Sequence, residues 1–162
     1  MMTTVKILAA VFAGFLLAAC QATGTHYLGA LADGEGGTIT ISGASTQKQS
    51  WEDLYLMIDS ELITVDGQQL LSGTVEFSHH SQGMYGQVRS LDLRVFLVDE
   101  ESRVVDYHTV MRFLGRSTRD KVPFRVVLPD APQAVAYTFG YEATFSEKKD
   151  SVSTWNLPSR QR

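Results

Sequence analysis

Apolar and polar residues alternate with a period of two over most of the chain after residue 38. The clearest alternation lies at 135–145, where one face carries Val135, Tyr137, Phe139, Tyr141, Ala143 and Phe145. Successive side chains of a β-strand point to opposite faces, so the pattern predicts strands with one covered face. Six apolar residues on one face predict that 135–145 is a central strand lying under a second layer.

The same period, broken by turn residues, predicts the other strands. Further strands are expected at 38–41, 54–58, 62–65, 68–78, 90–98, 103–114 and 122–128. Asp66-Gly67 separates two of them and favours a tight hairpin, because both central positions of a type I′ turn take positive φ. Residues 50–60 also carry apolar residues at helical spacing, so a short helix there remains an alternative.

No segment has a long helical period, and the strands are short and separated by turn signals. This pattern favours an all-β fold, an antiparallel immunoglobulin-like or fibronectin-like sandwich of about seven to eight strands. The predicted sandwich domain spans 38–146. A polar C-terminal tail is expected at 147–162, with Trp155 and Leu157 able to dock it on the domain.

The first twenty residues have the order of an export signal. Lys6 supplies a positive charge, residues 7–17 are apolar, and the small residues Ala18 and Ala19 precede Cys20. A charged region, an apolar region and a small-residue cleavage site are typical of a signal peptide, expected here at 1–19. The apolar run is shorter than the roughly 20 residues needed to span a bilayer.

Leu17-Ala18-Ala19-Cys20 resembles the lipobox of bacterial lipoproteins. The resemblance implies that the Cys20 thiol is alkylated with diacylglycerol and that a peptidase cuts between Ala19 and Cys20. It also accounts for the one cysteine, which can form no intramolecular disulfide. Gln21 stands where Asp would be the usual signal for retention in the inner membrane, so the resemblance implies the outer membrane rather than the inner one.

Residues 20–37 connect this cysteine to the first predicted strand. They contain five glycines and no period, and so favour a flexible, lipidated tether, with a poorly patterned first strand as the alternative.

Three segments are similar to immunoglobulin-like envelope modules of the FxLYD type. They are 72–77, 96–99 and 124–128, whereas 79–87 departs from the pattern with a longer loop. The similarity supports the predicted fold and implies nothing about catalysis.

The net charge and the motifs of the chain argue against several classes of function. A formal net charge of −4 argues against a nucleic-acid-binding protein. No Gly-x-Ser-x-Gly and no phosphate-binding glycine loop is present, so we expect no enzyme and no cofactor. The acidic turn at 99–101 lacks the spacing of a calcium loop and is interpreted as a soluble hairpin tip.

His79, His80 and Met84 form the one candidate metal site, because imidazole and thioether ligands together suit copper. Neighbouring residues of a strand point to opposite faces, so the pair cannot chelate one ion unless the backbone is irregular. Solvated loop histidines are the other interpretation.

The sequence therefore predicts a non-enzymatic cell-envelope lipoprotein. Its domain would be an interaction or assembly module on the periplasmic side, held to the bilayer by acylated Cys20 and contacting another envelope protein. The alternative is a periplasmic ligand- or metal-binding module that uses the loop of His79, His80 and Met84.

Overall fold

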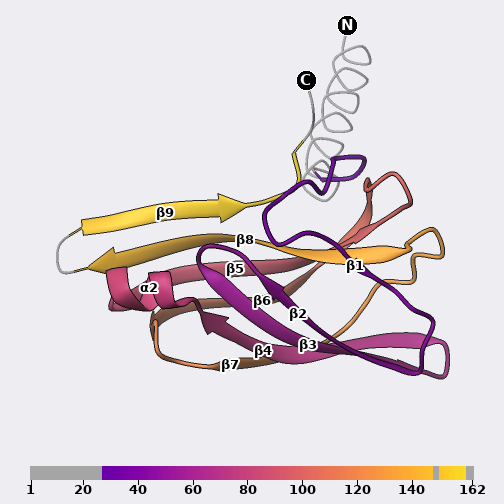
Figure 1. The fold of residues 1–162 in the computed structure, drawn as a ribbon, viewed down its shortest axis with the longest axis horizontal. Helices are drawn as coiled ribbons and strands as arrows, with labels where there is room; N and C mark the ends of the chain where they lie inside the picture. Colours follow the sequence, from indigo (N-terminus) through magenta and orange to yellow (C-terminus); the bar gives the residue numbers. More distant parts are fainter. Residues whose placement is uncertain (1–26, 148–149, 160–162) are drawn as a thin grey trace, which may run out of the picture.

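Two antiparallel sheets pack face to face in the computed structural model, which describes residues 27–147 and 150–159 (Figure 1). The larger sheet contains β1 (Ile39–Thr40), β5 (Gln87–Val98), β6 (Val104–Ser117), β8 (Ala136–Glu147) and β9 (Asp150–Asn156). The smaller sheet contains β2 (Thr46–Glu52), β3 (Leu56–Val65), β4 (Gln68–Phe77) and β7 (Val122–Val127). A short helix, α2 (His79–Met84), follows β4.

The strand order in the larger sheet is β1-β8-β5-β6, with β9 also paired to β8; in the smaller sheet it is β2-β3-β4-β7. β5 occupies one edge of β8 along its whole length. β1 and β9 share the other edge, since β1 pairs with Ala136 and Tyr137 and β9 pairs with residues 141–147. The prediction of an all-β antiparallel sandwich is confirmed. The prediction that 135–145 forms a central strand is confirmed as well, because β8 has neighbours on both sides.

The core lies between the sheets and is filled by the inward positions of the alternating pattern. The largest fully buried side chains include Trp51, Phe77, Phe96, Tyr137, Tyr141 and Phe145. Five of these belong to one apolar cluster between the sheets, and Phe96 belongs to a second cluster. The exclusion of these aromatic surfaces from water is the main stabilising contribution to the fold.

The helical alternative at 50–60 is wrong. Trp51 lies in β2 and Ile58 in β3, where they are cross-strand partners. Asp53 ends β2 by accepting hydrogen bonds from the backbone N–H groups of Tyr55 and Leu56, which forms a tight turn. Apolar residues at 51, 55 and 58 therefore fit a strand, a turn and a second strand as well as they fit a helix.

The structure extends the domain at both predicted boundaries. Residues 150–156, placed in the polar tail 147–162, form β9, because their backbone pairs with the exposed edge of β8. Residues 27–37, placed in the tether 20–37, include Ala30 and Ala32, which are buried, and Gly29 and Ala32 donate to backbone carbonyls at 104 and 102. The described strands number nine rather than seven or eight. β2 and β9 were not predicted, and the strands predicted at 54–58 and 62–65 are parts of one strand, β3.

The predicted signal peptide 1–19 and the lipidation site at Cys20 lie outside the described residues. No helix in the ranges that the structure describes is long and apolar enough to cross a membrane.

Candidate functional site

The outer face of the five-stranded sheet is divided into a covered half and an open half. On the covered half Phe96, Val98, Val104 and Ala136 form an apolar cluster under residues 27–32 and Leu157. The ring of Tyr27 packs edge-on against Phe96 and against Tyr107, with centroid distances of 5.2 Å in both contacts. The segment before β1 therefore belongs to the folded domain and closes this half of the face.

The open half consists of two adjacent rows of side chains that cross four strands. The first row contains Arg112, Asp92, Glu142 and Trp155, which are successive cross-strand partners on β6, β5, β8 and β9. The second row contains Leu114, Ser90, Thr144 and Ser153, which are paired in the same way. The three small hydroxyl residues leave a depression of about 790 Å³ beside the large side chains of the first row. We call this depression, lined by both rows, the outer-face groove.

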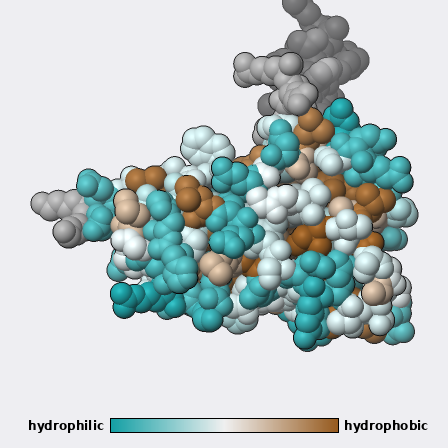
Figure 2. Space-filling view, in the orientation of Figure 1, coloured by the Kyte–Doolittle hydropathy of each residue, from teal (hydrophilic) through white to brown (hydrophobic). Residues whose placement is uncertain are grey.

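The two ends of the groove carry exposed apolar side chains. Trp155 is 71% exposed and Leu114 is 82% exposed, whereas Trp51, the other tryptophan, is 1% exposed in the core. Figure 2 shows small apolar clusters among hydrophilic residues on the side that it presents. Tryptophan is enriched at protein interfaces, so a tryptophan this exposed marks a candidate interaction site.

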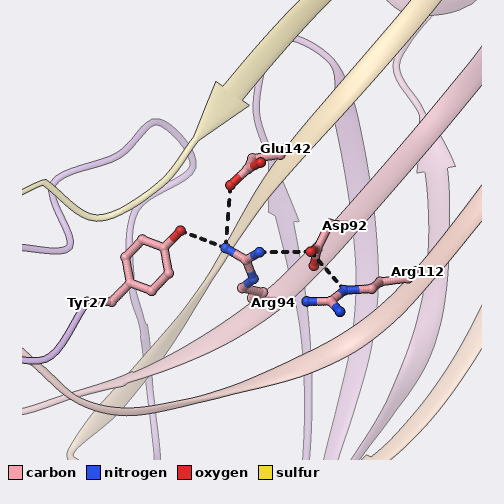
Figure 3. Close-up of polar contacts among 5 residues, drawn as sticks. All are labelled: Tyr27, Asp92, Arg94, Arg112 and Glu142. Atoms are coloured by element: carbon pink, nitrogen blue, oxygen red, sulfur yellow. Dashed lines mark hydrogen bonds and ion pairs between the residues drawn. The ribbon is translucent and has the colours of Figure 1, made fainter. Parts of the chain in front are cut away.

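A network of charged side chains separates the two halves of the face (Figure 3). Arg94 donates from Nη2 to Asp92 Oδ2 at 2.8 Å and from Nη1 to the phenol oxygen of Tyr27 at 2.6 Å. Its Nη1 is also 3.6 Å from Glu142 Oε1, and Arg112 Nε donates to Asp92 Oδ2 at 2.8 Å. Two cations and two anions thus neutralise one another at the groove.

Burial controls the chemistry of this network. The guanidinium carbon of Arg94 lies 5.4 Å from the ring centroid of Tyr27, within the range of a cation–π contact. Burial raises the pKa of Tyr27, against the opposing effect of Arg94, so the phenol keeps its proton to a higher pH than a free tyrosine does. Asp92 Oδ1 is buried and is the one such side-chain atom without a hydrogen-bond partner among the described residues.

The free edge of β9 is a second feature beside the groove. Three of the other four edge strands carry protection against unwanted pairing: Lys48 on β2, Pro123 and Arg125 on β7, and two arginines with a register shift on β6. The fourth, β1, is only two residues long. On β9 the one charged residue is Asp150, at its start. In the described part of the chain β9 pairs with β8 alone, so its other edge is open.

The strand register shows which backbone N–H and C=O groups of β9 face its free edge. Ile41 N donates to Val135 O, which makes their pair a hydrogen-bonded one, and the pairing continues to Tyr137. Because backbone groups alternate along an antiparallel strand, the odd-numbered residues of β8 direct theirs toward β1 and β9. Their partners on β9 are Val152, Thr154 and Asn156. The N–H and C=O groups of Ser151, Ser153 and Trp155 therefore face the free edge.

The candidate metal ligands lie on α2, where the sequence suggested a strand end and loop. His79, His80 and Met84 are exposed, and the ring of His80 contacts Tyr55 edge-on at 5.6 Å. Ser78 caps the helix by accepting from Ser81 N. Within the described residues no three His, Cys, Asp or Glu side chains gather where they could hold a metal ion.

The acidic turn at 99–101 has a structural role. Asp99 Oδ1 accepts hydrogen bonds from the backbone N–H groups of Glu101 and Arg103, at 3.1 and 2.8 Å, and so closes the connection between β5 and β6.

Sequence reasoning missed the groove. Its members are far apart in the chain and were predicted only to lie in strands, while Trp155 was assigned to the tail. Their positions become adjacent only through the pairing of β9 with β8 and of β8 with β5. An indole in a mostly polar C-terminal segment was the available signal.

Comparison of the chain with protein-family models, with curated protein sequences and with solved structures gives no match.

Proposed function

We propose that this chain is a non-enzymatic cell-envelope lipoprotein, anchored by a lipid on Cys20 and facing the periplasm. Its β-sandwich serves as an interaction module for another envelope protein. The lipobox-like Leu17-Ala18-Ala19-Cys20 supports the anchor, and Gln21 supports delivery to the outer membrane.

The open edge of β9 is the observation that carries the interaction module. An edge strand presents N–H and C=O groups in the spacing that another extended segment needs, and strand addition is a recurring mode of protein recognition. β9 offers those groups at Ser151, Ser153 and Trp155, and it has no charge between residues 151 and 156. A partner segment pairing there would form main-chain hydrogen bonds beside the exposed indole of Trp155.

A photo-reactive residue placed at Ser151 in cells tests this proposal. We expect a crosslinked protein adduct from Ser151 that is absent when the same residue is placed at Arg125, on the edge of β7. The adduct should persist in Ser153→Ala, which keeps the edge-facing N–H, and be lost in Ser153→Pro, which removes it. An adduct of equal intensity in the alanine and proline variants would contradict strand addition at β9.

A further inference from the structure

We infer that the outer-face groove binds a neutral oligosaccharide, with one pyranose ring stacked on the indole of Trp155. This inference goes beyond the proposed function, because it concerns the face of the sheet and requires no protein partner. It depends on the chemistry of the two rows that line the groove.

Trp155 supplies the apolar half of such a site. A pyranose ring has C–H groups on its faces and hydroxyls around its rim, so it packs well against a flat aromatic ring that is open to solvent. Trp155 meets this requirement, because it is 71% exposed and stands at the end of the first row. An aromatic side chain with one open face provides a large contact area at a low entropic cost.

The floor and the first row supply the polar half. The hydroxyls of Ser90, Thr144 and Ser153 line the floor. Arg112 uses Nε for Asp92, and its two terminal nitrogens make no hydrogen bond to the residues that the structure describes. Glu142 is half-exposed, with its nearest cation at 3.6 Å, so its carboxylate can accept further bonds. Neighbouring sugar hydroxyls match such fork-shaped donors and acceptors.

Charge and volume select among ligand classes. The charges of Asp92, Arg94, Arg112 and Glu142 cancel, so the groove has no net attraction for an anion such as a nucleotide or for a cation. A purely apolar ligand would remove water from Arg112 and Glu142 without replacing its hydrogen bonds. The volume of about 790 Å³ lies within the range of roughly 300–1,000 Å³ typical of small-ligand sites. A neutral ligand with many hydroxyls satisfies each of these conditions.

Intrinsic fluorescence can report this binding selectively. Trp51 is sealed in the core, so a ligand on the outer face changes the emission of Trp155 and leaves that of Trp51 unchanged. The full chain, in a detergent whose head group contains no sugar, is titrated with cellotetraose, maltotetraose and the tetramer of N-acetylglucosamine. Titration to about 10 mM covers the millimolar affinities expected for an open site. Calorimetry on the same samples gives a readout that does not depend on the indole.

We expect a saturable shift in emission with at least one tetraose. The affinity measured by calorimetry should be at least tenfold weaker in Trp155→Ala. Val152→Ala is the matched control, because it lies on the same strand, is 41% exposed and points to the opposite face. It should bind as the unmodified chain does. Co-sedimentation with purified cell-wall glycan distinguishes a polymeric source from a soluble one, and Trp155-dependent binding to either source supports the site.

No saturable response to any of the three tetraoses or to the glycan overturns the inference. Equal affinity of the unmodified chain and Trp155→Ala overturns it as well. Either result leaves the crosslink from Ser151 unaffected, so failure here is distinguishable from failure of the proposed function.

Discussion

The phenol of Tyr141 donates a hydrogen bond of 2.7 Å to Oδ2 of Asp53, which joins the two sheets of the sandwich. The same oxygen accepts from Asn156 Nδ2 at 3.1 Å, and Oδ1 accepts from the backbone N–H groups of Tyr55 and Leu56. One carboxylate thus connects the turn between β2 and β3 with β8 and with the end of β9. Its bond to Asn156 adds a side-chain contact to the backbone pairing that holds β9 against β8.

Tyr141→Phe should lower the free energy of unfolding by about 1.5–3 kcal/mol, the usual contribution of a hydrogen bond to a charged group. Asp53→Ala should cost about 3 kcal/mol or more, because it leaves four donors without their acceptor. Urea denaturation of each variant measures both values.

Tyr137→Phe is the control for the buried phenol. The hydroxyl of Tyr137 meets Ser60 Oγ at 3.3 Å, a longer contact between neutral groups, so its loss should cost about 0.5–1.5 kcal/mol. Equal losses of stability in Tyr137→Phe and Tyr141→Phe would show that the hydrogen bond to Asp53 contributes no more than a bond between neutral groups.

Stability should fall at alkaline pH because of the same tyrosines. Burial, with the adjacent Asp53 carboxylate, raises the pKa of Tyr141 well above its usual value, and burial raises that of Tyr137. The unfolded chain releases these protons near pH 10, while the folded chain keeps them, so the unfolded state binds fewer protons. Their contribution is fully present below about pH 10 and declines above it by roughly 1.4 kcal/mol per pH unit for each tyrosine.

Unfolding by urea at a series of pH values above 9 measures this decline, which should be smaller in Tyr141→Phe. Ultraviolet absorbance of tyrosinate, followed as the pH rises, shows whether the buried phenols ionise in the folded chain. If all six tyrosines ionise reversibly before the chain unfolds, the buried phenols are not held neutral by the fold.

Gly140→Ala should destabilise the protein and loosen β9. A Cβ at Gly140 would lie 2.6 Å from the backbone oxygen of Asn156 and 2.8 Å from the ring of Phe96, and neither can move without disturbing the sheet. Overpacking of this kind typically costs about 1–3 kcal/mol.

Gly83→Ala is the matched variant, because a Cβ there meets nothing within 4 Å. Gly83 lies in α2, so alanine should be neutral or stabilising by about 0.5–1 kcal/mol. Hydrogen exchange of the β9 amides, together with denaturation, compares the two variants. Unchanged protection of β9 in Gly140→Ala would contradict the close approach of the two strands.

The strands could be predicted from sequence because their covered faces repeat every two residues. β8 is the clearest example, since each inward position from Tyr137 to Phe145 is apolar and buried. β9 could not be predicted in this way, because it lies at the edge, buries little and has the composition of a tail. The groove could not be predicted for a related reason: the register that aligns Asp92, Glu142 and Trp155 is set by backbone pairing, which leaves no periodic mark in the sequence.

Gln21→Asp should redirect the protein from the outer to the inner membrane if Gln21 permits outward sorting. The residue lies outside the described part of the chain, so the prediction depends on the lipobox resemblance alone. Fractionation of the two membranes, with Gln21→Asn as the uncharged control, measures the shift. Identical distribution of all three forms would contradict this role for Gln21.

The lipid on Cys20 is the central claim, and growth of cells with labelled palmitate tests it most directly. A single acyl chain gives marginal membrane binding, whereas several chains give stable anchoring. We predict that the protein takes up label and fractionates with membranes. Cys20→Ala should take up none, while the folded domain keeps its β-type circular dichroism. Absence of label on the unmodified protein, in cells where a control lipoprotein is labelled, would contradict the account.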